Sequence, residues 1–587
     1  MMRRASYAFA LAALACWGAS PEHPKLSKDL VGVAAVSNVK VIVQWKSAPD
    51  NAKHQKVIDR GGVLNSVHPL INAAAYTIST AELNDLANDS DVAFISPDRP
   101  VTAKLDYTAA AVNASYAWGL KLDGTGIGVA VIDSGMNQSP DLTENNHVVY
   151  NQDFTGEVKP NANVKDTKNA PDLFGHGQHV SGIIASSGQT SSCGNCTRLL
   201  KGIAPGASII NLRALNEDGE GTDSMVIAAI EKAIALKNTY NIRVINLSLG
   251  RPIYESYTQD PLCQAVEQAW KAGIIVVVAA GNDGRDDSFG AQGYGTITAP
   301  GNDPYVITVG AMKTEGTYTR TDDLIASYSS KGPTQIDHIV KPDIVAPGNQ
   351  VVSLLAKNNA TLITQNPANN VPVSYYQDPN NHGASNAYFM LSGTSMAAPV
   401  VSGAAADLLE AQPTLTPDQV KALIMQTAYK TFPASSTAVD PTTGQAYIDY
   451  YDIFTVGAGY LDLKAALQSV NSVPAGVTAI SPTANYNNGT GAVTLSYDPS
   501  SLWANQAVWG ARSVWDAQSV WGATVLSGSR CVWGAQSVWG AASISSSQSV
   551  WGAQAVWGAQ SVWGARSVWG ATTDSAEALS IAINGER

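Results

Sequence analysis

The chain has 587 residues, of which 45% are hydrophobic and 14% charged, with 50 glycines and a formal net charge of −12. This length is too great for one core, so the sequence predicts a protein of several globular domains. The negative charge provides no basic surface for DNA or RNA, and we expect no nucleic-acid partner.

The first residues are typical of an export signal. Two arginines precede a short apolar run, and the triplet Ala-Leu-Ala at 13–15 fits a small-x-small cleavage site. We therefore expect residues 1–20 to be a signal peptide and the protein to be secreted or held at the cell surface. Cleavage before Cys16 would instead indicate a lipoprotein, although the preceding residues fit that pattern poorly. The run is too short to span a bilayer, and no later stretch is long enough.

Residues 36–100 are predicted to form a small domain. Strands are expected at 39–45 and 92–98, helices at 51–60 and 81–90, and two more strands in "GVLNSVH" and "AAAYTIS" between the helices. The order β-α-β-β-α-β is that of a ferredoxin-like α+β unit.

Residues 112–468 have the pattern of an α/β domain. Short Val- and Ile-rich runs that end in Gly, Ser, Asn or Asp are typical of buried parallel strands. They occur at 126–135, 207–215, 242–250, 273–283 and 304–311. Amphipathic helical patterns, such as 222–237, lie between them. The sequence therefore predicts a doubly wound, mostly parallel sheet, with the working crevice beyond the carboxyl ends of its strands.

Ser395, in "LSGTSMAAPVVSG", lies at the start of a predicted helix. The apolar positions from Met396 onward repeat with helical spacing, and Pro399 is expected in or just past the first turn. Unpaired N–H groups at a helix start favour developing negative charge, as acyl transfer requires. A serine also needs a base and a carboxylate to become a nucleophile.

Both partners occur upstream: Asp133 ends the strand "GIGVAVIDSG" and His176 lies in "FGHGQHVSG". The order Asp, His, Ser together with "VIDSG", "GHGQHVSG", "AAGND", "SYSSKGP", "KPDIVAPG" and "GTSMAAP" resembles the subtilisin-like serine proteases. Taken singly, each residue has a plainer interpretation as a turn residue, a packed histidine or a helix cap. These plainer interpretations do not explain why all three residues and the motifs around them occur together in the order of the family.

The resemblance implies roles for particular residues. Asp133 would orient His176, His176 would act as general base and then general acid, and Ser395 would attack the scissile carbonyl. Asn282 would donate its amide to the oxyanion, assisted by the N–H of Ser395. Two segments would pair with a polypeptide substrate as edge strands: Ser248-Leu249-Gly250 and Gly219-Glu220-Gly221.

The resemblance also bears on the flanking region and on cofactors. Residues 36–100 resemble an inhibitory propeptide, removed between about Pro97 and Ala114; an independent adaptor domain is the alternative. No cofactor is expected for the chemistry. The calcium loop of many relatives is replaced here by the stretch with "SSCGNCTRLLKG", so structural calcium stays unassigned, with Asp141 as a loosely aligned candidate. Gln178 stands where threonine is usual in the family, and for His179 we expect a structural role.

Cysteines are too few for a disulfide framework, since only five occur in the chain. Cys193 and Cys196 form a C-x-x-C that could be redox-active or half a zinc site, but a local disulfide is the favoured interpretation for an exported protein. Cys263 lies in a predicted helix and is expected to be buried.

After a predicted linker at 469–500, a repeat region covers 501–571 and a tail covers 572–587. From Trp503 to Trp569 there are twelve positions six residues apart, and tryptophan fills ten of them. In a strand all these rings would share one side, whereas a helix would scatter them, so we expect an extended repeat. A secondary period of 18 residues favours a triangular β-solenoid, although duplication of a disordered 18-residue unit would leave the same trace.

The aligned tryptophans could contact the cell envelope or carbohydrate, or form the core of the repeat. Two functions therefore compete. One is a secreted serine endopeptidase made as a zymogen. The other is a surface-binding repeat protein with an inactive protease-like scaffold.

Overall fold

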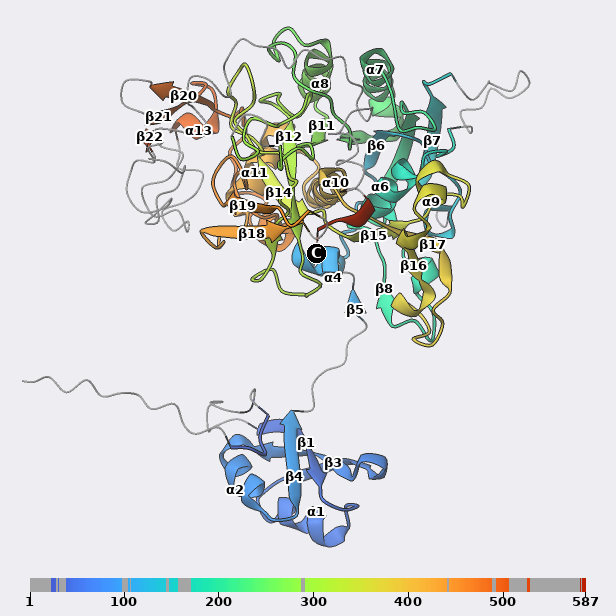
Figure 1. Ribbon diagram of the computed structural model, residues 1–587, viewed down its shortest axis with the longest axis vertical. Helices are drawn as coiled ribbons and strands as arrows, with labels where there is room; N and C mark the ends of the chain where they lie inside the picture. The colour runs from blue at the N-terminus through green and yellow to red at the C-terminus, as the bar shows by residue number, and fades with distance from the viewer. Residues whose placement is uncertain are drawn as a thin grey trace, which may run out of the picture. The chain divides into compact units, whose positions relative to one another are not determined.

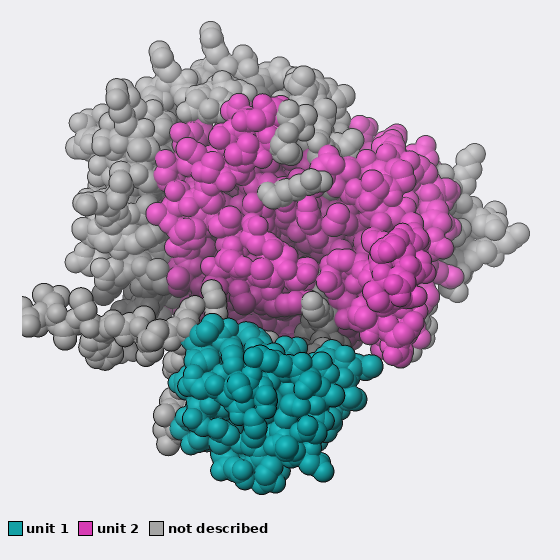
Figure 2. All heavy atoms as spheres, turned by 60° about the horizontal axis from the view of Figure 1, so that its bottom comes forward, with its two compact units in different colours: residues 1–102 teal, residues 103–587 magenta. Residues whose placement is uncertain are grey.

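The structure of the protein is a computed structural model that describes residues 23–27, 30, 38–97, 104–105, 107–143, 147–156, 170–286, 291–440, 443–487, 492–505, 525–527, 581 and 583–586. The chain divides into two compact units, Met1–Thr102 and Ala103–Arg587 (Figure 2). The expected signal peptide and nearly all of the tryptophan repeat lie outside the described residues.

Unit 1 has its elements in the order that the sequence predicts. They are β1 (Asn38–Trp45), α1 (Asn51–Ile58), β2 (Val63–His68), β3 (Ala73–Ser79), α2 (Leu83–Asn88) and β4 (Val92–Pro97). The four strands form an antiparallel sheet in the order β2-β3-β1-β4. Alternate apolar residues of the strands, among them Val41, Val43 and Ile95, pack with the helices into a separate core.

Unit 2 is built on an eight-stranded sheet, in the order β13-β12-β11-β10-β6-β9-β7, with β14 also paired to β12 (Figure 1). The strands are β6 (Gly128–Asp133), β7 (Val148–Asp153), β9 (Ser208–Arg213), β10 (Ile242–Leu247), β11 (Ile275–Ala279), β12 (Ile307–Lys313), β13 (Leu324–Ile325) and β14 (Ile344–Pro347). Only the β12–β13 pair is antiparallel among these described pairs. This arrangement confirms the predicted doubly wound α/β class.

Helices cover the sheet in two pairs. The helix α7 (Asp223–Tyr240) packs against α8 (Pro261–Lys271), while α6 (His176–Ala185) packs against α10 (Thr394–Ala411). Because helices lie against it, the central strand β6 is buried at every residue, which accounts for its continuous apolar sequence. Thr222 caps α7, and Asp260 with Pro261 begins α8, as is usual for helix starts.

Smaller elements surround this framework. The helices are α3 (Tyr107–Ala111), α4 (Ala114–Gly119), α5 (Pro140–Thr143), α9 (Thr361–Gln365), α11 (Pro417–Thr427), α12 (Leu463–Gln468) and α13 (Leu502–Asn505). The strands are β5 (Lys104–Leu105), β8 (Arg198–Leu199), β15 (Val351–Leu354), β16 (Asn370–Pro372), β17 (Ala384–Leu391), β18 (Ser435–Val439), β19 (Ala446–Tyr450), β20 (Thr483–Asn487), β21 (Ala492–Ser496) and β22 (Val525–Ser527). None of the described helices has the length and apolar character needed to cross a membrane.

The stretch at 469–500, predicted as a linker, contains the strands β20 and β21. Ala484 and Leu495 from these strands are buried in the core of unit 2. Turn residues dominate the sequence of this stretch, so its apolar positions are too few to show a strand pattern.

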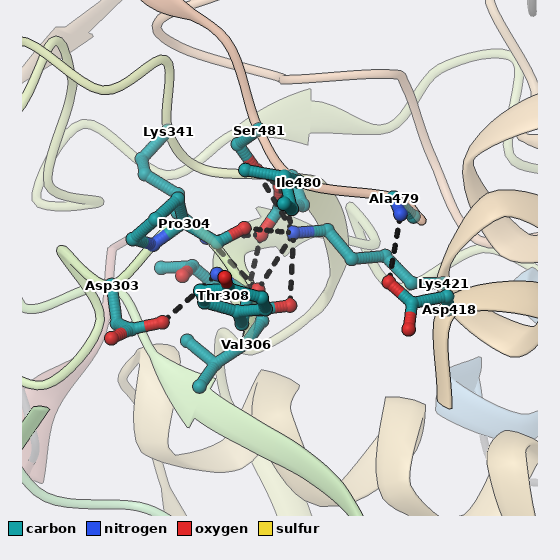
Figure 3. Close-up of polar contacts among 12 residues, drawn as sticks. Asp303, Pro304, Val306, Thr308, Lys341, Asp418, Lys421, Ala479, Ile480 and Ser481 are labelled. Atoms are coloured by element: carbon teal, nitrogen blue, oxygen red, sulfur yellow. Dashed lines mark hydrogen bonds and ion pairs between the residues drawn. The ribbon is translucent and has the colours of Figure 1, made fainter. Parts of the chain in front are cut away.

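A buried cluster of charges ties α11 to the sheet and to the stretch before β20 (Figure 3). The Lys421 ammonium donates to the carbonyls of residues 304–306 at 2.8–3.1 Å and to Ser481 Oγ at 2.9 Å. Asp343 accepts from Lys341 at 2.6 Å and lies 3.2 Å from the Lys421 ammonium. Burial lowers the pKa of Lys421 to about 7; Asp343 opposes this effect and Lys341 adds to it.

The cysteine predictions are confirmed. Cys193 and Cys196 form a disulfide, and Cys263 is free and buried on α8.

Candidate active site

Asp133 and His176 meet at the carboxyl end of β6. Asp133 is the last residue of this strand and His176 is the first residue of α6, and His176 Nδ1 lies 2.8 Å from Asp133 Oδ1. A Cβ on Gly177 would lie 2.4 Å from the Gly135 carbonyl oxygen, so only glycine lets the helix start approach the strand end this closely. Burial opposes protonation of the imidazole, but the Asp133 carboxylate outweighs it, and the pKa of His176 is raised above its ordinary value.

Asp172 fixes the start of α6, a role that the sequence reasoning missed. Its buried carboxylate accepts hydrogen bonds from the N–H of Gly175 at 2.6 Å, the N–H of Gln178 at 2.8 Å and Ser134 Oγ at 2.9 Å. Ser134 Oγ in turn accepts from the N–H of Gly177 at 2.9 Å. Burial raises the pKa of Asp172, while these donors favour its ionised form. An acidic residue just before a predicted helix start was the signal that could have identified it.

Ser395 is the second residue of α10 and is buried. Its Oγ donates to the main-chain carbonyl of Ser248 at 3.2 Å. Pro399, inside the helix, has no N–H, so the Ser395 carbonyl lacks its helical donor. Ser248 Oγ replaces that donor at 2.7 Å and is itself held by Asn246 Nδ2 at 3.0 Å. Because Pro399 leaves this carbonyl without a helical donor, Ser248 can link the start of α10 to the end of β10.

Asn282 lies beside the same helix start. Its Oδ1 accepts from the N–H of Thr394 at 2.9 Å and from Thr394 Oγ1 at 3.1 Å. These two donors fix which end of the amide is the oxygen, because a backbone N–H can only donate. The Nδ2 group is thereby turned toward Gly393, where an added Cβ would lie 3.2 Å from it. Gly393 has a φ of 141°, which favours glycine.

The two predicted substrate segments contact the starts of the two site helices: Ser248 contacts Ser395 of α10, and Gly219 lies against Phe174, just before α6. Ser248, Leu249 and Gly250 directly follow β10, and the next residue, Arg251, exchanges main-chain hydrogen bonds with Ala299. Gly219, Glu220 and Gly221 form the turn between β9 and α7, where the Glu220 carbonyl accepts from Asn216 N–H at 2.8 Å. A Cβ on Gly219 would lie 2.6 Å from the Phe174 ring, so this turn packs on the residues that lead into α6.

Asp141 and His179 are held by hydrogen bonds. One Asp141 oxygen accepts from the N–H and Oγ1 of Thr190, and the other from Ser186 Oγ and Tyr388 Oη. Within the described parts of the chain, no group of three or more metal-ligating side chains is present. His179 Nε2 lies 3.0–3.1 Å from the carbonyl oxygens of Val351 and Phe389, and burial lowers its pKa to about 3. A neutral His179 thus links α6 to β15 and β17.

The chain is similar to proteases of known type. The family model described as the subtilase family matches residues 124–450. Serine protease AprX of Bacillus subtilis (strain 168) is 36% identical over 363 residues, which cover 60% of this chain and 73% of the relative. Subtilisin E of the same organism is 31% identical over 392 residues, covering 66% and 83%. The extracellular serine proteinase of Thermus sp. (strain Rt41A) is 31% identical over 372 residues, covering 60% and 70%.

The family model spans more than half of the chain and covers the strand ends and helix starts described above. The chain belongs to the subtilase family and is a serine-type endopeptidase.

Proposed function

We propose that the protein is a secreted endopeptidase that uses Asp133, His176 and Ser395 to cleave polypeptides through an acyl-enzyme. The observation that carries this proposal is the 2.8 Å contact between His176 Nδ1 and Asp133 Oδ1. His176 begins α6, which packs against α10, the helix whose second residue is Ser395. An aspartate bound to Nδ1 leaves Nε2 to receive a proton and favours the imidazolium that results.

In the first step the Ser395 hydroxyl exchanges its contact with the Ser248 carbonyl for His176 Nε2, by rotation about its side-chain bond. Ser395 Oγ then attacks the carbonyl carbon of the substrate while His176 takes the hydroxyl proton. His176 returns this proton to the leaving amine, which leaves an ester on Ser395. Water attacks the ester by the same route, and Ser395 regains its proton.

Negative charge on the substrate oxygen is stabilised by Asn282 Nδ2 and the N–H of Ser395. Thr394 holds the oxygen end of the Asn282 amide, so the donor end is already oriented and no reorganisation is needed during attack. The substrate main chain adds as a strand between 248–250 and 219–221, and recognition through main-chain hydrogen bonds fits broad specificity.

Unit 1 acts as a propeptide that inhibits unit 2 until it is removed between about Pro97 and Ala114. Its separate core supports this role, because a domain that is cut away must fold by itself. Export depends on the signal peptide at 1–20, and the tryptophan repeats make a contact with the cell envelope or with carbohydrate. Calcium stays unassigned, since four hydrogen-bond donors surround Asp141.

Labelling with a fluorophosphonate tests the nucleophile, with mass spectrometry of the chain to follow cleavage between the units. We expect the native protein to be labelled after self-cleavage, and Ser395→Ala to be neither labelled nor cut. Ser224→Ala is a matched control, because Ser224 also lies in the first turn of an 18-residue helix, and it should be labelled and cut normally. Labelling that survives in Ser395→Ala would refute the assignment. Failure of the native protein to label or cut itself would favour the inactive surface-binding scaffold.

A further inference from the structure

Residues 583–586 contact the rest of unit 2 through their main chain. Asn349 Nδ2 donates to the Glu586 carbonyl at 2.7 Å, and the Glu586 N–H donates to Asn349 Oδ1 at 2.7 Å. Asn369 Nδ2 donates to the Ile583 carbonyl. One side-chain amide thus binds both main-chain groups of Glu586, as a neighbouring strand would. In Figure 1 this red segment lies beside β15, which Asn349 precedes by two residues.

The Glu586 side chain enters a site made for a carboxylate. It is 3% exposed, and its Oε2 accepts from the N–H of Ser327 at 2.7 Å and from Ser327 Oγ at 2.9 Å. Lys313 lies 3.1 Å from Oε1 and Arg285 lies 3.5 Å from Oε2. Both cations are nearly buried, so the acidic side chain supplies negative charge where water is largely excluded.

The position before Glu586 favours glycine. Gly585 has a φ of 62°, and a Cβ there would lie 2.5 Å from Ser392 Oγ. The site therefore selects for a Gly-Glu pair by shape as well as by charge.

This site lies next to residues 392–393, the loop between β17 and α10 that leads to Ser395. Ser392 Oγ accepts from the N–H of Gln350 at 2.9 Å, and the Gly393 N–H donates to the Gly348 carbonyl at 2.8 Å. Asn349, which binds Glu586, sits between these two contacts. Binding of Glu586 by Asn349 therefore acts on the turn between β14 and β15, whose Gly348 carbonyl accepts the Gly393 N–H.

We propose that Asn349, Ser327, Lys313 and Arg285 form a peptide-binding site whose ligand is an Asn-Gly-Glu segment, in this chain residues 584–586. The ligand class is an extended peptide with a glycine followed by a buried carboxylate. The site lies beside the loop 392–393. None of its four residues belongs to the proposed substrate segments 248–250 and 219–221. It does not depend on the proposed catalytic mechanism.

The test measures binding of a fluorescein-labelled peptide of residues 579–587 to a chain that stops after Ser580 and carries Ser395→Ala, so that the peptide is not cut. Fluorescence anisotropy should show saturable binding, and mass spectrometry confirms that the peptide stays intact. Glu586→Gln in the peptide should weaken binding roughly ten- to a hundredfold, because charge-assisted hydrogen bonds to a buried group are lost. Gly585→Ala should weaken it by a similar factor, and Ser580→Ala, the control, by less than about twofold. No binding to a folded shortened chain, or equal binding of the Glu586→Gln peptide, would overturn the proposal.

A second measurement uses the full chain with Ser395→Ala and needs no truncation. Hydrogen–deuterium exchange should be slow at the N–H groups of Ser327 and Glu586, since both are donors within the site. Glu586→Ala should speed exchange in the fragments that contain these two groups at least tenfold. Glu577→Ala changes another acidic residue of the same tail and should leave both rates unchanged. Equal exchange in the two variants would also overturn the proposal.

Discussion

The hydrogen bond from Ser248 Oγ to the Ser395 carbonyl replaces one that Pro399 cannot make. Both serines are buried, so Ser248→Ala leaves a carbonyl oxygen without a donor in a place that water does not reach. An unsatisfied buried acceptor costs about 1–3 kcal/mol. We therefore expect Ser248→Ala to lower the free energy of unfolding of unit 2 by this amount.

The cost should depend on the residue at position 399. Pro399→Ala restores an N–H four residues after Ser395, where a helix normally supplies the donor for that carbonyl. In the Pro399→Ala background, Ser248→Ala should cost less than about 1 kcal/mol, because the new N–H takes over the acceptor. The two changes should thus be coupled by about 1–2 kcal/mol.

Urea unfolding of the four combinations measures this coupling, with Ser395→Ala in every chain to prevent self-digestion. The carbonyl of residue 395 is unaffected by that change. Thr427→Ala is the matched control, because Thr427 Oγ1 donates to the Leu423 carbonyl within α11 at 2.7 Å, outside this network. Its cost should be the same with Pro399 or Ala at 399. A coupling between Ser248→Ala and Pro399→Ala below about 0.5 kcal/mol would show that the proline does not create the need for Ser248.

Three further predictions concern charges and the oxyanion site. The pKa of Lys421 is about 7 in the folded chain and 10.5 ordinarily. Between pH 7 and pH 10.5, Lys421 therefore keeps its proton in the unfolded chain but loses it in the folded chain. Stability should therefore rise with pH across this window by at most about 1.4 kcal/mol per pH unit, and urea unfolding of Lys421→Met should show a flatter profile. Asp172→Asn removes a negative charge that helps to raise the pKa of His176, so the acid limb of the kcat/KM profile should move to lower pH; an unmoved limb would argue against this influence. Asn282→Ala should lower kcat by about 100- to 1000-fold with little change in KM, which is the loss known from removal of such a donor in a subtilisin. Asn282→Asp keeps the acceptor for Thr394 and should preserve stability but not activity, and a normal kcat in either variant would exclude Asn282 from the oxyanion site.

The central framework could be predicted from the sequence because its pattern is local. Strands such as β6 and β11 are buried throughout and consist almost entirely of apolar residues, and α7 shows its buried side at helical spacing. The edge strand β7 was missed, because its residues are only half-buried and three of its six are polar. The residues Asp133, His176, Asn282 and Ser395 could be named because they lie in recognisable motifs at strand ends and helix starts.

The sequence alone determined the fold class, the family motifs and the candidate site residues. Only the tertiary structure decided that Asp172 holds the start of α6 and that Ser248 donates to the Ser395 carbonyl. The same is true of Glu586, which fills a site beside the loop that leads to Ser395. In the last two cases the partners are 147 and 259 residues apart. Periodicity describes how a segment meets the core but does not say which polar groups face each other there, because those contacts are set by chain topology.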